Sequence, residues 1–312
     1  MAFLGLSNER RAVEWPTVAL AAVIYGGWAA LTFFHAALPT WFVIVLGAWL
    51  IAWHSSLQHE IVHCHPTRWR RVNDMLGFAP LSLWLPYARF PMTHLVHHRD
   101  EALTDPLDDP ESFYLTPAQW QRLDPPRRAL LWAQTTLLGR LVLGPAWTVS
   151  RFLADELWAI ATGDRKRARI WAVHIAGVAG VIYWLVAICD MSIWFYVAAL
   201  VYPGTALLLV RSFAEHRAAP DIRQRIAIVE NAWILGPLFL FNNLHAAHHE
   251  RPDLPWYELP RWYHANRERL VLANGGLVYD GYVEIVRRFL FVPHDTPIHP
   301  YGPAIRSAAP SS

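Results

Sequence analysis

Residues 16–58 read PTVALAAVIYGGWAALTFFHAALPTWFVIVLGAWLIAWHSSLQ and contain no Asp, Glu, Lys or Arg. A Leu-Pro-Thr triplet at residues 38–40 interrupts this run near its middle. Each half approaches the ~20 residues that an α-helix needs to cross the hydrocarbon of a bilayer. The run therefore predicts two transmembrane helices, over residues 16–35 and 41–56, joined by a tight turn.

A second pair of apolar segments lies in the other half of the chain. Residues 170–189 and 191–210 carry no charge and are separated by Asp190. The composition agrees, since 54% of the 312 residues are hydrophobic and 17 are Trp, a profile outside the usual range of soluble globular proteins. We predict an all-α integral membrane protein with four transmembrane helices in two hairpins.

Basic residues are distributed unevenly around these helices. The two turns, at residues 37–40 and 189–192, contain no Lys or Arg. By the positive-inside bias, both termini and the long middle segment are expected in the cytoplasm, and the first helix is too long for the core of an export signal. The basic residues that flank the opposite ends are Arg10, Arg11, Arg68, Arg70, Arg71, Arg165, Lys166, Arg167, Arg169 and Arg211.

Two shorter apolar runs, residues 76–88 and 232–241, are too short to span a bilayer and are predicted to be interfacial or re-entrant, packed beneath the spanning helices. In residues 128–161 and 260–272, Trp, Leu and Arg alternate at helical spacing. That pattern is typical of helices at the headgroup boundary and equally of ordinary amphipathic packing.

We predict one membrane domain over residues 1–302, followed by a disordered tail at 303–312. The two cysteines, Cys64 and Cys189, fall at opposite ends of the predicted helices and are not expected to form a disulfide.

Histidines are the most informative polar residues, because eight of the sixteen fall into three tight groups. On a helix, residues three and four apart share a face, so we expect each group to aim its imidazoles at one point. Imidazole suits Fe, Zn, Cu and Ni, and eight ligands exceed what one ion takes. Two ions that share them, with room for dioxygen or water, account for the pattern. The groups are His59 and His63; His94, His97 and His98; and His245, His248 and His249.

Topology adds a ninth candidate. His59 and His63 are expected just beyond the inner end of the second helix, and His216 just beyond the inner end of the fourth, at the same depth. His65 points to another helical face, so its part is left open, as is that of Asn242. The remaining histidines are read as ordinary polar residues: His35, His54, His174, His264, His294 and His299.

The sequences His59-Glu60-Ile61-Val62-His63, His94-Leu95-Val96-His97-His98 and His245-Ala246-Ala247-His248-His249 resemble the three histidine boxes of the membrane fatty-acid desaturase and hydroxylase superfamily. Their order, with a hairpin between boxes two and three, is similar too. The flanking Gln58, Pro66, Thr104-Asp105-Pro106 and Asn242-Asn243 resemble a bacterial fatty-acid desaturase-like branch.

This resemblance implies a mushroom-shaped bundle of four transmembrane helices, capped by a cytosolic domain that holds two non-haem iron ions, in a bacterial inner membrane. His216 is similar to the additional ligand of membrane alkane hydroxylases. The predicted metal ligands are His59, His63, His94, His97, His98, His216, His245, His248 and His249, with no catalytic residue beyond them and with their division between the two irons left open.

The family chemistry implies that O2 and two electrons remove hydrogen from an unactivated carbon of a fatty-acyl or lipid chain. Loss of a second hydrogen gives desaturation, whereas rebound gives hydroxylation, and substrate placement decides between them. Box one has three residues between its histidines where many acyl-CoA desaturases have four, so hydroxylases or ketolases of alkanes, carotenoids or lipids stay open. Candidates to orient the imidazoles from behind are Glu60, Glu215, Asp105, Asp108 and Asp109.

The electrons need an external source. The chain has no dinucleotide fingerprint, and two cysteines are too few for rubredoxin or a four-cysteine cluster. We expect a separate electron-donor protein of the ferredoxin, rubredoxin or cytochrome type, with its reductase. The basic cytoplasmic side suits an acidic donor and suits anionic lipid headgroups equally.

A function of another class also fits part of the pattern. His59-Glu60-x-x-His63 matches the motif of zinc metalloproteases, in which the glutamate is the general base. That interpretation leaves boxes two and three without a purpose. A metal transporter is disfavoured because the predicted spans hold no charged residue that would mark an ion path.

Overall fold

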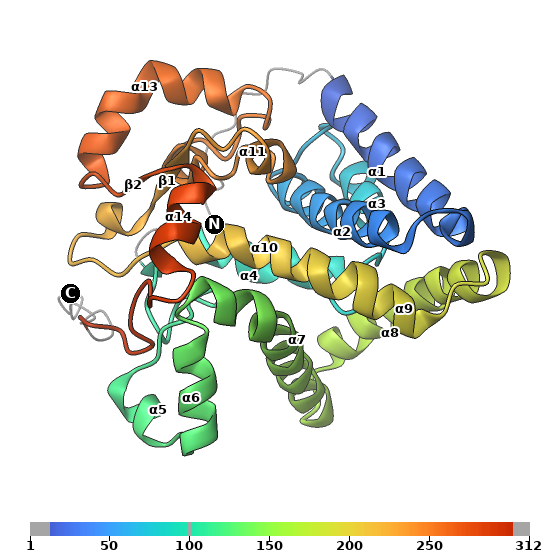
Figure 1. Cartoon of the computed structure of the whole chain (residues 1–312), viewed down its shortest axis with the longest axis horizontal. Helices are drawn as coiled ribbons and strands as arrows, with labels where there is room; N and C mark the ends of the chain where they lie inside the picture. Colours follow the sequence, from blue (N-terminus) through green and yellow to red (C-terminus); the bar gives the residue numbers. More distant parts are fainter. Residues whose placement is uncertain (1–12, 99–101, 302–312) are drawn as a thin grey trace, which may run out of the picture.

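The computed structural model describes residues 13–98 and 102–301. The tail predicted at 303–312 lies outside these residues. The chain is mostly helical, with long helices at one side and a cap of shorter elements at the other (Figure 1). Cys64 and Cys189 are both free, as predicted.

Within the described residues, four helices are long and apolar enough to span a membrane, in agreement with the prediction. They form two antiparallel hairpins. In the first, α1 (Trp15–Phe33) and α2 (Thr40–Val62) are joined by η1 (His35–Ala37). In the second, α8 (Arg165–Tyr183) continues through the π-helical turn η4 (Trp184–Ile188), and α9 (Ile193–Tyr196), η5 (Val197–Val201) and α10 (Tyr202–Glu215) form the returning helix.

Two helices extend further than the sequence predicted. Helix α2 continues to Val62, so that His59 lies within its last turn rather than beyond its end. Helix α10 continues to Glu215, and His216 is its C-cap. The physical reason is that the cap covers these ends: Gln58, His59 and Glu215 are all buried. The cap supplies polar partners for these side chains, so the helix continues past the apolar run. We call this end of the bundle the histidine end.

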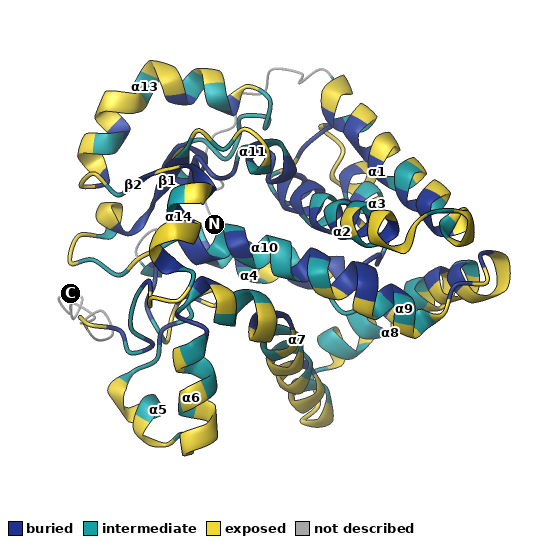
Figure 2. Ribbon diagram, viewed as in Figure 1, coloured by how far each residue is buried: buried dark blue, intermediate teal, exposed yellow. Residues whose placement is uncertain are grey.

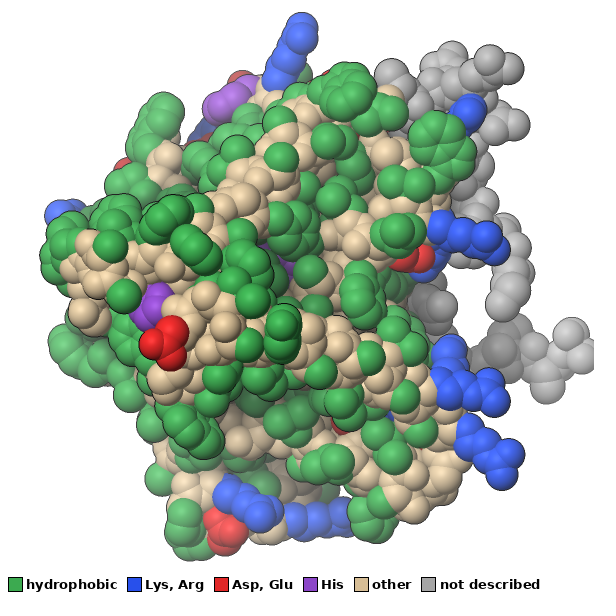
Figure 3. Space-filling view, turned by 90° about the vertical axis from the view of Figure 1, so that its right-hand side faces the viewer, with side chains coloured by type: hydrophobic (Ala, Val, Ile, Leu, Met, Phe, Trp, Pro, Cys, Tyr) green, Lys and Arg blue, Asp and Glu red, His purple; other side chains and the backbone are tan. Residues whose placement is uncertain are grey.

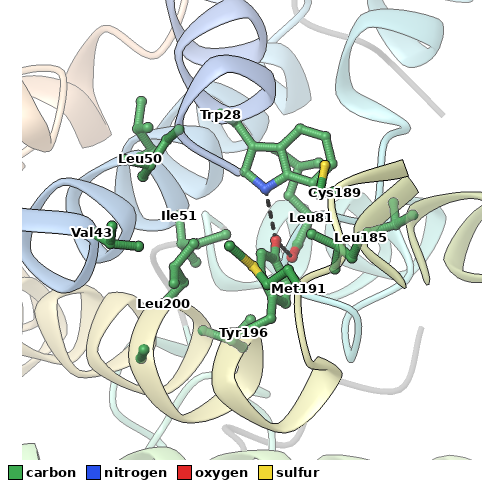
Figure 4. Packing of buried hydrophobic residues seen from close by; sticks show 14 residues of the cluster. Trp28, Val43, Leu50, Ile51, Leu81, Leu185, Cys189, Met191, Tyr196 and Leu200 are labelled. Carbon is green, nitrogen blue, oxygen red and sulfur yellow. Dashed lines mark hydrogen bonds between the residues drawn. The ribbon is translucent and has the colours of Figure 1, made fainter. Parts of the chain in front are cut away.

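Close packing between the hairpins rests on small residues. A Cβ atom on Gly47 of α2 would lie 2.3 Å from Leu200, and one on Gly204 of α10 would lie 2.6 Å from Ile51. Glycine is needed at both positions because helices in a membrane associate through close backbone approach. In Figure 4, Trp28 Nε1 donates to the Tyr196 hydroxyl over 2.9 Å, within the same apolar cluster.

Residues 78–86 form an irregular segment between the spanning helices, after α3 (Arg70–Gly77) and before η2 (Tyr87–Arg89). The Tyr196 hydroxyl donates to the Leu81 carbonyl over 2.6 Å, and His174 Nε2 bonds the Leu83 carbonyl over 2.9 Å. Prolines at 80 and 86 prevent a continuous helix. Side chains of the spanning helices thus satisfy two of its carbonyls, an arrangement that favours the re-entrant alternative.

The cap contains the remaining elements. It includes one short two-stranded parallel sheet, in which Ile228 pairs with Val278, within a chain that is otherwise helical as predicted. The run at 232–241 contributes only one helical turn, α11, which packs on α2 through a bond from Trp53 Nε1 to the Pro237 carbonyl. The elements are α4 (Phe90–His97), α5 (Pro117–Gln121), α6 (Pro125–Ala133), α7 (Leu137–Ala161), η6 (Ile222–Arg225), β1 (Ile228–Glu230), α11 (Leu235–Leu238), α12 (His245–Glu250), α13 (Leu259–Ala273), β2 (Val278–Asp280) and α14 (Gly281–Phe289).

Apolar side chains remain exposed where lipid is expected. The far ends of the spanning helices present a largely hydrophobic face, with Lys and Arg near its margins (Figure 3). Helix α7 also exposes residues along much of its length (Figure 2), among them Val142, Leu157 and Trp158. The predicted helices at 128–161 and 260–272 are thus present as α6 with α7 and as α13, and the exposed apolar face of α7 favours contact with lipid.

A buried ion cluster joins α7, α8 and the start of α4. Glu156 of α7 is 2% exposed and accepts from Arg89 Nε over 3.0 Å, from Arg167 Nη1 over 3.2 Å and from Trp171 Nε1 over 2.9 Å. Arg89 is the N-cap of the helix that carries box two. The cluster therefore ties the second hairpin to that box.

We predict that Glu156→Gln destabilises the fold, because Arg89 is left buried without a counter-charge. Removing one partner of a buried pair costs about 3 kcal/mol or more. The measurement is the midpoint of thermal unfolding in detergent, with Asp155→Asn, an exposed neighbour on the same helix, as the control. Equal midpoints for the two variants would contradict the role given to the cluster.

Candidate metal centre

The nine predicted histidines all meet at the histidine end. His59 and His63 come from the end of α2, and His216 comes from the end of α10. The other six come from α4 with its C-cap and from α12. They form two groups, and within each group the ligand atoms lie within 4.8 Å of one another. Group one is His59, His63, His94, His98 and His248, and group two is His97, His216, His245 and His249.

The expectation that each histidine cluster aims at one point is wrong for boxes two and three. His94 and His98 lie in group one while His97 lies in group two, and His245 and His249 lie in group two while His248 lies in group one. Helical geometry explains the division. Relative to the first histidine of a box, the residue four positions on is rotated by about 40° and the residue three positions on by about 60° in the opposite sense. Each i,i+4 pair therefore shares a group.

The spacing of the nitrogen atoms matches coordination. Two nitrogens that bind one ion at ~2.1 Å, at angles of about 90 to 109°, lie roughly 3.0 to 3.4 Å apart. In group one, the Nε2 atoms of His63 and His94 are 3.1 Å apart, and those of His98 and His248 are 3.2 Å apart. In group two, His216 Nε2 lies 2.9 Å from both His97 Nε2 and His245 Nε2.

The outer nitrogens fix the tautomers in group two. His216 Nδ1 lies 3.2 Å from the Arg225 carbonyl, and His245 Nδ1 lies 3.1 Å from Asn242 Oδ1. Both partners accept, so each imidazole donates Nδ1–H and keeps a lone pair on Nε2. Two lone pairs that face each other across 2.9 Å repel unless a cation lies between them. The donor set therefore fits a metal ion.

Burial keeps most of these imidazoles neutral, as metal ligands must be. Burial, and then the neighbouring imidazole charges, lower the pKa of His63, His248 and His249 well below the usual value. The same causes lower the pKa of His98 to about 2. His97 differs: burial lowers its pKa, but its hydrogen bond to Asp109 and the charges of nearby carboxylates outweigh burial and raise it to about 9.

Carboxylates orient three of the imidazoles from behind. Asp109 lies 3.0 Å from His97 Nδ1, and Glu215 lies 3.3 Å from His245 Nδ1, so two of the predicted candidates are in place. Asp105 instead accepts the backbone N–H groups of Leu107 and Asp108. Glu111, which the sequence did not single out, lies 3.0 Å from His94 Nδ1. Its position in an acidic loop after box two was the available signal.

Glu60 faces away from both histidine groups. It accepts the backbone N–H of Trp256 over 2.9 Å and belongs to a separate buried cluster with Glu14 and His65. His65 Nδ1 lies 2.7 Å from Glu14. His65 thus belongs to neither histidine group, and Glu60 lies outside both groups, whereas the protease motif requires it beside the ion that His59 and His63 bind.

Four of the six histidines that were predicted to be ordinary polar residues are buried and bonded to protein groups outside the two histidine groups. His54 bonds the Tyr25 hydroxyl, and His294 bonds the Tyr279 hydroxyl. His174 bonds a carbonyl of the re-entrant segment, and His299 bonds Thr104.

Comparison with known families agrees with this geometry. A family model described as fatty acid desaturase matches residues 35–282, which include all nine histidines. The chain belongs to the fatty acid desaturase family. A search of curated proteins gave no significant match.

A small cavity of about 40 Å³ adjoins group two. His97 and His216 line it, together with Glu111, Phe113 and Ser212. The volume admits only molecules about the size of water or dioxygen. On the outer side, a larger recess of about 340 Å³ reaches His249.

We predict that the histidines of one group, rather than of one box, share an ion. Replacing His98 and His248 by Ala should abolish one of two metal-binding affinities and leave the other unchanged, because both lie in group one. Replacing the sequence neighbours His97 and His98 should weaken both affinities. Metal titration of the purified protein against a competing chelator measures them, and an identical result for the two double variants would exclude the division.

We also predict that Asp109→Asn weakens metal binding about 10- to 100-fold, because the amide no longer fixes the His97 tautomer. The same titration measures the effect. Asp155→Asn, an exposed carboxylate on α7, is the control and should bind metal as the parent protein does. An unaltered affinity in Asp109→Asn would show that the bond to His97 is dispensable.

Proposed function

We propose that the chain is a membrane non-haem di-iron oxidoreductase that uses O2 and two electrons to desaturate a fatty-acyl or lipid chain. The observation that supports this most directly is the pair of adjacent groups built from imidazole alone. The ring of His98 in group one stacks on that of His249 in group two, with centroids 4.3 Å apart. Two ions held by such neighbouring sites can act on one oxygen molecule, and imidazole suits iron.

The iron ions, when bound, would activate O2, which is the oxidant that removes hydrogen from an unactivated carbon and is reduced to water. The protein supplies position and protection. Glu111, Asp109 and Asn242 accept the Nδ1–H groups of His94, His97 and His245 respectively, which aims the Nε2 lone pairs inward. His59, His94 and His245 are 4% exposed or less, so water has little access to these ligands.

Hydroxylation or ketolation of an alkane, carotenoid or lipid is the second candidate. It is favoured by the three-residue spacing between His59 and His63, where many acyl-CoA desaturases have four. The zinc protease alternative is disfavoured, because Glu60 bonds the Trp256 backbone and lies outside both histidine groups.

An external electron donor completes the proposal. The recess at His249 supports a route for electrons, since it brings a predicted ligand to the surface between Arg223 and Arg269. We propose a small acidic donor of the ferredoxin, rubredoxin or cytochrome type. We also propose that the histidine end faces the cytoplasm of a bacterial inner membrane, in line with the flanking Lys and Arg.

The decisive experiment is lipid and hydrocarbon profiling of a host that expresses the chain in air and without oxygen. We expect a new double bond in the acyl chains, seen only with oxygen, and about two iron ions in the purified protein. His97→Ala and His248→Ala should each abolish the product, whereas His264→Ala, an exposed histidine, should not. Retained product in both ligand variants, or one zinc ion in place of iron, would refute the assignment.

A further inference from the structure

Arg140 lies in the first turn of α7, close to the cavity beside group two. Its guanidinium carbon lies 5.2 Å from the centre of the Phe113 ring and 6.0 Å from that of Phe213. Its Nε donates to the Gln134 carbonyl over 3.1 Å. Within residues 13–98 and 102–301, no carboxylate lies within ion-pair distance of Arg140.

The surroundings of Arg140 favour an anion. The positive end of the helix dipole lies at the first turn of α7, so a cation placed there is destabilised. Burial, and then the charge of Arg151, lower the pKa of Arg140 to about 10. Arg140 is partly buried, and a cation withdrawn from water is costly unless a counter-charge joins it. The position is therefore one that an anionic ligand would stabilise.

A second hydrogen-bonding group lies beside the guanidinium. Gln134 is 5% exposed, and in the described part of the chain its buried Nε2 meets no acceptor. The side chains of Arg140 and Gln134 both lie beside Gly144 of α7. A Cβ atom at Gly144 would be 3.2 Å from Arg140 Cδ and 3.7 Å from Gln134 Oε1. The guanidinium of Arg140 and the amide of Gln134 are thus adjacent. Within the described residues, neither donates to an anionic group.

The location connects these donors to the metal centre. Phe113, on which Arg140 packs, lines the cavity that also contains His97 and His216. Ser212, next to Phe213 in α10, lines it as well. Helix α7 exposes Val142 nearby, on a face that favours lipid. Arg140 therefore lies between the exposed apolar face of α7 and the residues that line the cavity at group two.

We infer that Arg140 and Gln134 bind the anionic head group, carboxylate or phosphate, of the acyl substrate. The planar fork of arginine matches the paired oxygens of either group. This inference rests on the proposed function for the identity of the ligand as a substrate, whereas the binding itself requires neither iron nor oxygen.

Fluorescence titration with cis-parinaric acid and its methyl ester, on the purified full-length protein in neutral detergent, tests the inference. The acid should bind the parent protein at least tenfold more tightly than the ester. Arg140→Gln should weaken the acid about tenfold and leave the ester within a factor of two. The matched control is Arg122→Gln, an exposed arginine at the C-cap of α5, which should bind both probes as the parent does.

A second variant and a competition measurement extend the test. Gln134→Met keeps the guanidinium and should weaken the acid about threefold, which tests the site even if Arg140→Gln folds poorly. Competition by palmitate against lysophosphatidate tells whether the head is a carboxylate or a phosphate. Equal binding of acid and ester by the parent protein, or an unchanged acid affinity in both variants, would overturn the inference.

The two proposals can fail separately. If Arg140→Gln loses acid binding but a host that expresses the parent chain forms no oxidised product, the proposed reaction is refuted and the anion site stands.

Discussion

Lone pairs on buried imidazole nitrogens govern the architecture of this molecule. His216 presents its Nε2 at 2.9 Å from those of both His97 and His245, and burial lowers the pKa of His216 and His245 well below the usual value. Neutral nitrogens at such distances repel each other in a medium that contains no water. A cation bound among these nitrogens would remove the repulsion, so the histidines at the ends of α2, α4, α10 and α12 fit a metal ion.

The protein around these nitrogens holds them from behind. Carboxylates and carbonyls accept the Nδ1–H groups, and each acceptor is itself anchored: Glu215 pairs with Arg211 over 3.0 Å, and Asp109 accepts the Thr104 backbone N–H over 2.9 Å. The Glu156 cluster fixes the start of α4 in the same way, through Arg89. Rotation of an imidazole that is held in this way, such as His97, therefore also disturbs the hydrogen bonds of its partner.

The packing of the membrane-spanning helices also positions the histidines. Gly47 and Gly204 let α2 and α10 approach closely, and these two helices carry His59, His63 and His216 at their ends. The re-entrant segment at 78–86 fills the space between the hairpins and leads directly into the helix of box two. Its carbonyls are satisfied by Tyr196 and His174, which makes irregular backbone tolerable between spanning helices.

The sequence alone determined the four apolar helices and the nine histidines, because hydropathy over ~20 residues and the i,i+3 and i,i+4 spacing are local properties. It also contained the signal for the division into two groups, since every i,i+4 pair shares one. The tertiary structure alone decided which partners stand behind the imidazoles. Glu111 and Glu215 reach His94 and His245, while Glu60 turns to Trp256, and the strand pairing of β1 with β2 joins residues 50 positions apart. Contacts between distant segments depend on how the helices pack, and no local pattern records that packing.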